Sequence, residues 1–421
     1  MSAEPPALLL LRGGVVLGVL GLTLGACAAP PDQDPSAEAE STHSPGSLDP
    51  DPVPVQSPAE EVDLDAIRLP VHLTDLVSVD PGWDTPPQVH DGVFLGPREE
   101  EGRLVFSAVS ADGTLLWTAQ RPLSCTGFAL TSAGDRALAV LTDVDPENSP
   151  DDTSITTTAT AYDLHTGEPV WGPVEVPGPH QGPGLVFAEP HEEPMGGTDQ
   201  RVALDPETGE RIPDRGHVVG EFFGITVTAR DGEFIASGSE GQLWRAPSSN
   251  TSTTPDPEAP VSPATNRLPP GTALIGSSAA GYDLWDLTGG ELLAEGIQDA
   301  MFDLMSETWV AIREDELAGF DAAGGQLWSL GLDAEPEILG VGGVMAYVLA
   351  DGEHLDIYNV VTGNTARIYD PLDDGATAIP LAFTDTGATV VDTGTELVLV
   401  TDEPGPPEDA AAESELSDER P

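Results

Sequence analysis

Residues Asp163–Trp171 read DLHTGEPVW, and this stretch decides the fold. Asp163 is a short acid whose side chain can accept a hydrogen bond from a backbone N–H two residues further on and so begin a turn. Gly167 supplies the positive-φ position that closes the turn. An apolar strand precedes the turn and a second strand ends at Trp171, so the stretch predicts a β-hairpin.

The same pattern occurs seven times along the chain. The copies begin at Ser110, Asp163, Asp205, Ser237, Asp286, Asp321 and Asn359. The six steps between these positions average about 41 residues, the length of a four-stranded propeller blade. Alternating apolar runs upstream of the turns, such as 340–350, add further strands, and no segment shows sustained helical periodicity. The turn residues of the clearest copies are Asp163, Gly167 and Trp171, then Asp205 and Gly209, then Asp321, Gly325 and Trp328.

A propeller must also close its ring. The C-terminal run Thr377–Val400 offers three strands, and Leu69–Val79 offers one isolated strand at the other end. Pairing them in one sheet removes two free strand edges. The sequence therefore predicts an all-β fold, an eight-bladed β-propeller over residues 66–401 closed by its N-terminal strand. Seven blades are the alternative, because the copy at Asp205 lacks the Trp and could fall short of a full blade.

Five Trp residues lie near the hairpin ends, and their recurrence favours a structural role. An indole that fills the gap between neighbouring blades, with its N–H bonded to a carbonyl of the next blade, explains the repeated position. A stacking platform for a ligand is the functional alternative. The residues are Trp117, Trp171, Trp244, Trp285 and Trp328.

The copies D-x-x-T-G-x-x-x-W at Asp163 and D-x-x-G-G-x-x-W at Asp321 resemble the tryptophan-docking repeats of the PQQ-like, or quinoprotein alcohol dehydrogenase-like, β-propellers. The resemblance covers residues 66–401. It implies one of two functions, because that family contains both PQQ-dependent dehydrogenases and cofactor-free lipoprotein propellers that hold partner proteins. The dehydrogenases use a pair of adjacent cysteines, whereas Cys125 stands alone here. The chain is more similar to the cofactor-free branch, so we expect no cofactor.

The N-terminus resembles a bacterial lipoprotein signal. One cation, Arg12, precedes a 14-residue apolar run from Gly13 to Ala26, which is too short to span a bilayer. Leu24-Gly25-Ala26-Cys27 resembles a lipobox. The resemblance implies a signal peptide over residues 1–26, cleavage between Ala26 and Cys27, and attachment of palmitate or similar acyl chains at Cys27. An ordinary secretory signal is the alternative.

Two acidic segments flank the expected propeller. Residues 27–65 are rich in Pro, Ser and acids and predict a disordered tether. Residues 402–421 have the same composition and predict a disordered tail.

The charge balance excludes two classes of partner. The chain has 15 Lys+Arg, all of them Arg, against 73 Asp+Glu, for a formal net charge of −58. Such a molecule repels nucleic-acid phosphates and anionic lipid headgroups. Arg without Lys, together with abundant Ala, Gly and Pro, is typical of a GC-rich bacterium such as an actinobacterium.

Sequence signals for catalysis and metal binding are weak. The eight His residues have no metal-ligand spacing. The acidic loop 143–152 could bind Ca²⁺, but it lacks the glycine and terminal Glu of an EF-type loop, and a solvated loop is favoured. Cys125 stands among apolar residues in the sequence, and this predicts that its thiol is buried. A catalytic pair of carboxylates remains an alternative, because one sequence does not tell which acidic side chains lie close together in the fold.

We therefore expect a non-catalytic protein-binding or scaffolding module, lipid-anchored on the extracytoplasmic face of the cell membrane. Its partner would be a protein or peptide, and its negative field would favour basic surfaces. The alternative is an enzyme, either a PQQ- or other cofactor-dependent oxidoreductase or a hydrolase with a site on the ring axis.

Overall fold

The computed structural model describes residues 49–401, apart from 65–66, 71–72, 74–75, 126, 146–155, 190–199, 214–216, 248–267, 278–280, 315, 333–335, 351–353 and 370–376. The described chain is built from β-strands and turns and contains no α-helix. Accordingly, the described part offers no helix of the length and apolarity that a membrane span requires. The signal segment 1–26, Cys27, the tail 402–421 and most of the acidic loop 143–152 lie outside the described residues.

The strands form eight antiparallel sheets, which we number as blades in chain order. Blade 1 contains β1 (Val53–Pro58), β4 (Gln88–His90), β5 (Val93–Glu100), β6 (Arg103–Ser110) and β7 (Thr114–Pro122). Blade 2 contains β8 (Phe128–Ala133), β9 (Arg136–Asp145), β10 (Thr156–Asp163) and β11 (Pro169–Val176). Blade 3 contains β12 (Val186–Glu189) and β13 (Gln200–Ala203). Blade 4 contains β14 (His217–Phe222), β15 (Ile225–Arg230), β16 (Glu233–Gly238) and β17 (Gly241–Pro247).

The remaining four blades complete the chain. Blade 5 contains β18 (Thr272–Ser277), β19 (Gly281–Asp286) and β20 (Glu291–Ile297). Blade 6 contains β21 (Asp299–Asp303), β22 (Thr308–Arg313), β23 (Glu316–Asp321) and β24 (Gln326–Gly331). Blade 7 contains β25 (Glu337–Gly342), β26 (Met345–Leu349), β27 (Leu355–Asn359) and β28 (Thr365–Tyr369). Blade 8 contains β2 (Glu60–Glu61), β3 (Val77–Asp80), β29 (Ile379–Phe383), β30 (Thr389–Asp392) and β31 (Leu397–Thr401).

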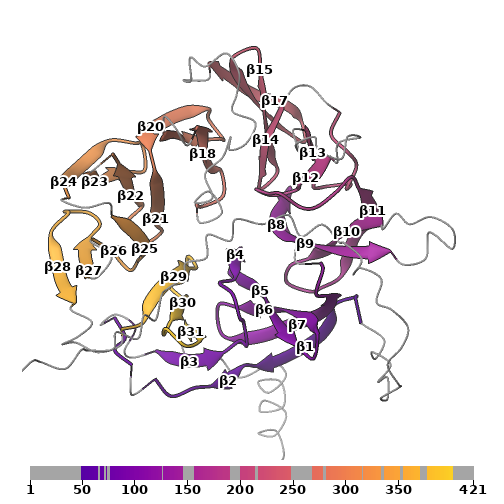
Figure 1. Cartoon of the computed structure of the whole chain (residues 1–421), viewed down its shortest axis with the longest axis horizontal. Helices are drawn as coiled ribbons and strands as arrows, with labels where there is room; N and C mark the ends of the chain where they lie inside the picture. The colour runs from indigo at the N-terminus through magenta and orange to yellow at the C-terminus, as the bar shows by residue number, and fades with distance from the viewer. Residues whose placement is uncertain are drawn as a thin grey trace, which may run out of the picture.

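The sheets follow one another around a ring, with first strands such as β4, β21, β25 and β29 toward its centre (Figure 1). A cluster of apolar side chains joins each blade to the next, including blade 8 to blade 1, so each sheet covers the face of its neighbour. The pairs of residues that share these clusters are Phe106 and Tyr162, Val140 and Leu204, Val186 and Val218, Val227 and Ile275, Leu284 and Ala300, Val310 and Val348, Ile357 and Ile379, and Val390 and Phe94.

The prediction of an all-β propeller is confirmed. Seven of the described sheets have three or more strands, and the two-stranded one, β12–β13, is the sheet that leads into the Asp205 copy. Isolated bridges from His180 to Phe187 and from Leu204 to Arg211 extend it on both sides. The choice between seven and eight blades, which the sequence left undecided, depends on this same copy.

The predicted closure of the ring is also confirmed, although the closing strand is shorter than Leu69–Val79. β3 pairs antiparallel with β31, and Val79 lies opposite Leu399. One hydrogen-bonded ladder therefore joins the N-terminal and C-terminal parts of the domain.

The predicted tether is wrong at its C-terminal end, because residues 49–61 belong to the propeller. β1 pairs with β7, placing Val53 opposite Thr118, and β2 pairs with β3. We call residues 49–61 the strap, because they join the outer edges of blades 1 and 8. An outermost strand needs a hydrogen-bonding partner on one side only, so a Pro-rich and largely exposed segment can form it. The domain therefore begins at or before Asp49.

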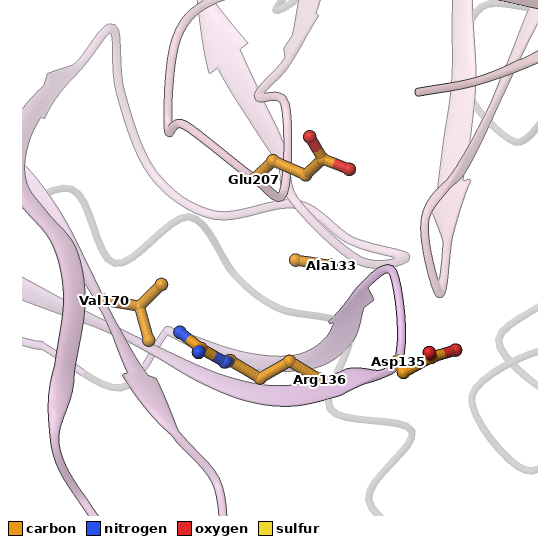
Figure 2. Close-up of a pocket in the computed structure, with 5 residues that line it drawn as sticks. All are labelled: Ala133, Asp135, Arg136, Val170 and Glu207. Atoms are coloured by element: carbon orange, nitrogen blue, oxygen red, sulfur yellow. The ribbon is translucent and has the colours of Figure 1, made fainter. Parts of the chain in front are cut away.

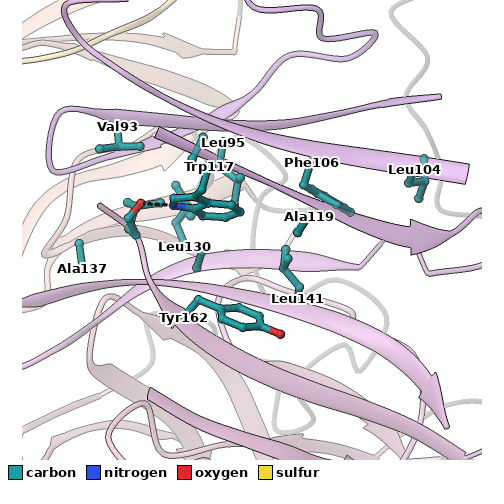
Figure 3. Close-up of a cluster of buried hydrophobic side chains, with 13 residues drawn as sticks. Val93, Leu95, Leu104, Phe106, Trp117, Ala119, Leu130, Ala137, Leu141 and Tyr162 are labelled. Atoms are coloured by element: carbon teal, nitrogen blue, oxygen red, sulfur yellow. Dashed lines mark hydrogen bonds between the residues drawn. The ribbon is translucent and has the colours of Figure 1, made fainter. Parts of the chain in front are cut away.

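Four of the five repeated Trp residues dock on the next blade, as the sequence predicted, whereas Trp285 lies against a Trp of the preceding blade and its Nε1 has no hydrogen-bond partner among the described residues. Trp117 of blade 1 is buried, and its Nε1–H donates to the carbonyl of Leu164 in blade 2 at 2.8 Å (Figure 3). The same bond joins Trp171 to Pro206 O (2.8 Å), Trp244 to Leu287 O (2.5 Å) and Trp328 to Val360 O (2.6 Å). Trp285 stacks on Trp244 with ring centroids 5.6 Å apart. These five side chains therefore act in packing.

Candidate interaction surface

The ring has two faces, which we name by their connections. Antiparallel pairing puts the turn between the first and second strands of a blade and the turn between its third and fourth strands on one side. We call this side the turn face. The opposite side, the connection face, carries the turns between the second and third strands and the passages from blade to blade. All the repeated turns that the sequence identified lie on the turn face. Blades 3 and 5 have fewer than four described strands, but carbonyls of their turns at Asp205 and Asp286 accept from the docked Trp of the preceding blade, as those of the turns at Asp163 and Asn359 do.

Short polar side chains hold the repeated turns in shape. Asp163 Oδ1 accepts hydrogen bonds from His165 N at 3.1 Å and Thr166 N at 3.0 Å. Asp205 accepts from Glu207 N at 2.8 Å, in the geometry that the sequence predicted. Equivalent bonds are made by Asp286, Asp321 and Asn359. Their carboxylates and amide thus order the backbone of the turn face.

Glycine completes these turns and leaves room for the docking Trp. Gly167 and Gly209 both have φ of 72°. A Cβ placed on Gly209 would lie 2.6 Å from the ring of Trp171, so the glycine is needed for packing as well as for its backbone conformation. In the sixth copy the positive-φ residue is Gly324 (φ 82°), so the prediction of Gly325 for this position is wrong by one residue. That turn is one residue shorter, and Gly325 N donates to Asp321 Oδ1 at 2.7 Å.

The turn face is strongly acidic. Among its described turns, Arg136 at the start of β9 faces a large excess of carboxylates, and its Nε lies 3.8 Å from Asp163 Oδ2. Burial opposes ionisation of Asp112, but hydrogen bonds from Ser110 and Thr114 bring the pKa of its carboxyl below the usual value. The acids of these turns include Asp91, Asp112, Asp135, Asp163, Glu168, Asp205, Glu207, Glu210, Glu240, Asp286, Glu307, Asp321 and Asp385.

A pocket of about 430 Å³ opens on this face between blades 2 and 3. Figure 2 shows Arg136 reaching toward Val170, while Asp135 points away on the β8–β9 turn and Glu207 lies across the pocket. Ala133 completes the lining. The pocket therefore combines a small apolar wall with charges of both signs.

The other residues weighed in the sequence do not converge on a site within the described chain. Cys125 is buried, as predicted. No group of three or more His, Cys, Asp or Glu side chains in the described parts has metal-binding geometry. His180 packs against Phe187 and bonds to Gly184 O at 2.7 Å, and burial lowers its pKa.

Sequence reasoning missed a buried carboxyl that joins three blades. Glu221 is the penultimate residue of β14 in blade 4, and its side chain is buried. It accepts hydrogen bonds from Thr131 Oγ1 of blade 2 (2.7 Å), Leu185 N of blade 3 (2.9 Å) and Gly224 N (2.6 Å). Burial raises its pKa despite these donors. All of these donors come from sequence-distant or turn positions, which no local pattern reveals.

Two solved structures align with this chain at low sequence identity. The crystal structure of BamB from Moraxella catarrhalis aligns with a TM-score of 0.38 and 13% identity, over 82% of this chain and 99% of that one. The computationally designed Ika8 protein aligns with a TM-score of 0.34 and 13% identity, over 84% of this chain and 100% of that one. No family profile matches the chain, and a search of curated proteins returns no relative.

Proposed function

We propose that the chain is a lipid-anchored, extracytoplasmic β-propeller that binds or scaffolds a partner protein and has no catalytic role. One observation carries the proposal: the turn face is an acidic surface on a backbone held by repeated side-chain hydrogen bonds. A surface ordered before binding loses little conformational entropy when a partner arrives. A broad negative field accelerates encounter with a basic partner and disfavours acidic ones.

The position of the strap fits this arrangement. β1 runs antiparallel to β7 with Pro58 opposite Thr114 at the turn-face end, and Asp49 O accepts from Gln120 N at 2.9 Å near the other end. A chain coming from an acylated Cys27 would therefore reach the propeller from the connection-face side. The turn face would stay open for a partner.

Site-specific photocrosslinking in intact cells tests the binding function. A photoreactive residue at Asp91 or Asp286 on the turn face should give a discrete crosslinked protein with a basic surface. The same residue at Asp231, in the β15–β16 turn of the connection face, is the matched control. Crosslinks of equal yield from both faces, or none from the turn face, would contradict the proposal.

Anchoring and the absence of catalysis need separate measurements. Cys27→Ser should abolish labelling with a radioactive fatty acid and release the chain from the membrane, and persistent labelling would show that the acyl chain is elsewhere. Dye-linked alcohol oxidation by the purified chain after addition of PQQ and Ca²⁺ would establish the enzymatic alternative in place of the scaffold.

A further inference from the structure

Among the described residues, exposed apolar side chains gather on the turn face over blades 6 and 7. Leu304 and Met305 form the β21–β22 turn and are 40% and 69% exposed, and Val361 in the β27–β28 turn is 43% exposed. Val344, in the β25–β26 turn, is half-buried. We call these four residues the apolar patch. They come from three turns of the same face.

Hydrogen bonds link the three turns into one rigid surface. The buried Asp303 accepts from Ser306 N at 3.0 Å in its own turn and from Val344 N at 3.4 Å in the next blade. Val344 O in turn accepts from Val360 N at 3.1 Å. The docked indole of Trp328 donates to Val360 O at 2.6 Å. A buried carboxylate and a docked Trp therefore fix a surface whose apolar side chains point into water.

The backbone of the patch is also held in unusual conformations. Val344 has φ of 67° and Glu307 has φ of 52°. A β-branched residue rarely adopts the left-handed region, where glycine or asparagine would be easier. Strain of this kind persists where the surroundings impose it, and it is common at binding sites. The strained valine lies at the centre of the patch.

The patch differs from the other exposed leucines of the described chain. Those leucines are 39–48% exposed and come from four different blades, which is ordinary for a protein surface. They are Leu123, Leu243, Leu292 and Leu327. The patch instead joins neighbouring turns and has acids around it, with Glu307 in the same turn, Asp321 in the outer turn of blade 6 and Asp385 in the inner turn of blade 8. An apolar centre within a charged rim is the usual anatomy of a protein–protein interface.

We propose that the apolar patch is the docking site for a basic protein segment that buries an apolar side chain against Leu304, Met305 and Val361. The flanking Arg or Lys of that segment would face Glu307, Asp321 and Asp385. Met305 suits this role because an unbranched thioether adapts to the shape of a partner side chain. The inference rests on the proposed binding function and locates it on the ring.

Binding of three synthetic 12-residue peptides to the full chain, purified in mild detergent, tests the proposal. The first peptide has two central Leu flanked by Arg, the second has Ser in place of Leu, and the third has Glu in place of Arg. Fluorescence anisotropy in about 0.3 M salt, where long-range attraction is screened, should show binding of the first peptide only.

Variants then locate the contact. Leu304→Ser with Met305→Ser should weaken the first peptide about tenfold, and Glu307→Gln should weaken it less. The matched control is Leu243→Ser with Leu327→Ser, which removes two equally exposed leucines and should change affinity less than twofold. Thermal unfolding of each variant checks that the fold is kept.

The outcomes separate the two proposals. If the first peptide binds the patch variant as tightly as the wild type, the patch is not the site, although the binding function stands. Equal losses in the patch and control variants would show nonspecific apolar contact and overturn the location. If none of the peptides binds, the patch and the preference for basic partners are both wrong.

Discussion

Glu221 shows how one residue can hold three blades together. Its carboxyl takes hydrogen bonds from blade 2, from blade 3 and from its own turn, and a Cβ on Gly184 would collide with it. A buried carboxyl that loses its water is easier to protonate, which is why its pKa is raised. The protonation of this one carboxyl therefore makes the stability of the contacts among the three blades depend on pH.

Glu221→Gln should lower the free energy of unfolding by roughly 1–3 kcal/mol at pH 5, because the amide nitrogen replaces an acceptor that now serves Leu185 N. The raised folded-state pKa makes the wild type most stable below the ordinary Glu pKa and less stable as pH rises through the raised value. The difference between variant and wild type should therefore narrow toward pH 8. Urea unfolding at several pH values measures it.

Glu210→Gln removes the same charge from an exposed position and is the control. It should change stability by less than about 0.5 kcal/mol at every pH. A Glu221→Gln protein as stable as the wild type across this range would show that the carboxyl does not hold the blades.

At this scale, the sequence predicts what is local. Asp163 and Gly167 lie within one turn, so their roles follow from residue type and spacing, and the structure has both as expected. Glu221 stands in a strand with no distinguishing neighbours, and its partner Thr131 is 90 residues away. Leu304 and Met305 have apolar side chains that are typical of a core. The sequence does not show that their turn leaves them exposed.

The strap is the element whose structure departs most from its sequence. It covers the free edge of β7 and also completes the surroundings of a buried cation, because the guanidinium of Arg121 donates to the carbonyl of Pro50. Arg121 also bonds to Thr142 O at 3.2 Å and Tyr162 Oη at 3.4 Å. Tyr162 Oη reaches Asp51 Oδ1 at 3.3 Å, so the strap also touches blade 2. Composition alone could not reveal these contacts, since an acidic, Pro-rich segment with few apolar residues is typical of a linker.

Deletion of residues 49–61 should therefore lower the free energy of unfolding by about 3 kcal/mol, because Arg121 loses a buried acceptor and β7 loses its ladder partner. Deletion of residues 30–42, a segment of equal length closer to Cys27, is the control and should have no effect. Urea-unfolding midpoints of the two deletions give the comparison. Equal midpoints would mean that the strap adds nothing to the stability of the ring.

At the scale of the molecule, the chain has a formal charge of −58, and the clusters of apolar side chains between neighbouring blades hold the ring together. Repulsion among carboxylates opposes the compact state, whereas burial between blades favours it. The period of the copies predicted both the ring and its closure because each hairpin needs a neighbour to cover its apolar face. The number of full blades could not be predicted, since the Asp205 copy has a turn like the others but a sheet of two strands.

Raising NaCl from about 0.05 to 0.5 M at pH 7 should increase the urea-unfolding midpoint, since the screening length falls from more than 10 Å to less than 5 Å. At pH 4, close to the sequence pI of about 4.1, the same change in salt should have little effect. The contrast between the two pH values identifies repulsion as the cause. A midpoint that falls with salt at pH 7 would show instead that attractive ion pairs dominate.

The pairing of β3 with β31 has a consequence for the order of events during biosynthesis. On the proposed extracytoplasmic side, Val79 would leave the export channel early, whereas its partner Leu399 would follow only when nearly all of the chain has crossed the membrane. β3 would wait with an unpaired edge, and such long-range pairing is slow. Chaperones on the extracytoplasmic side would therefore be needed longest at the strap and β3.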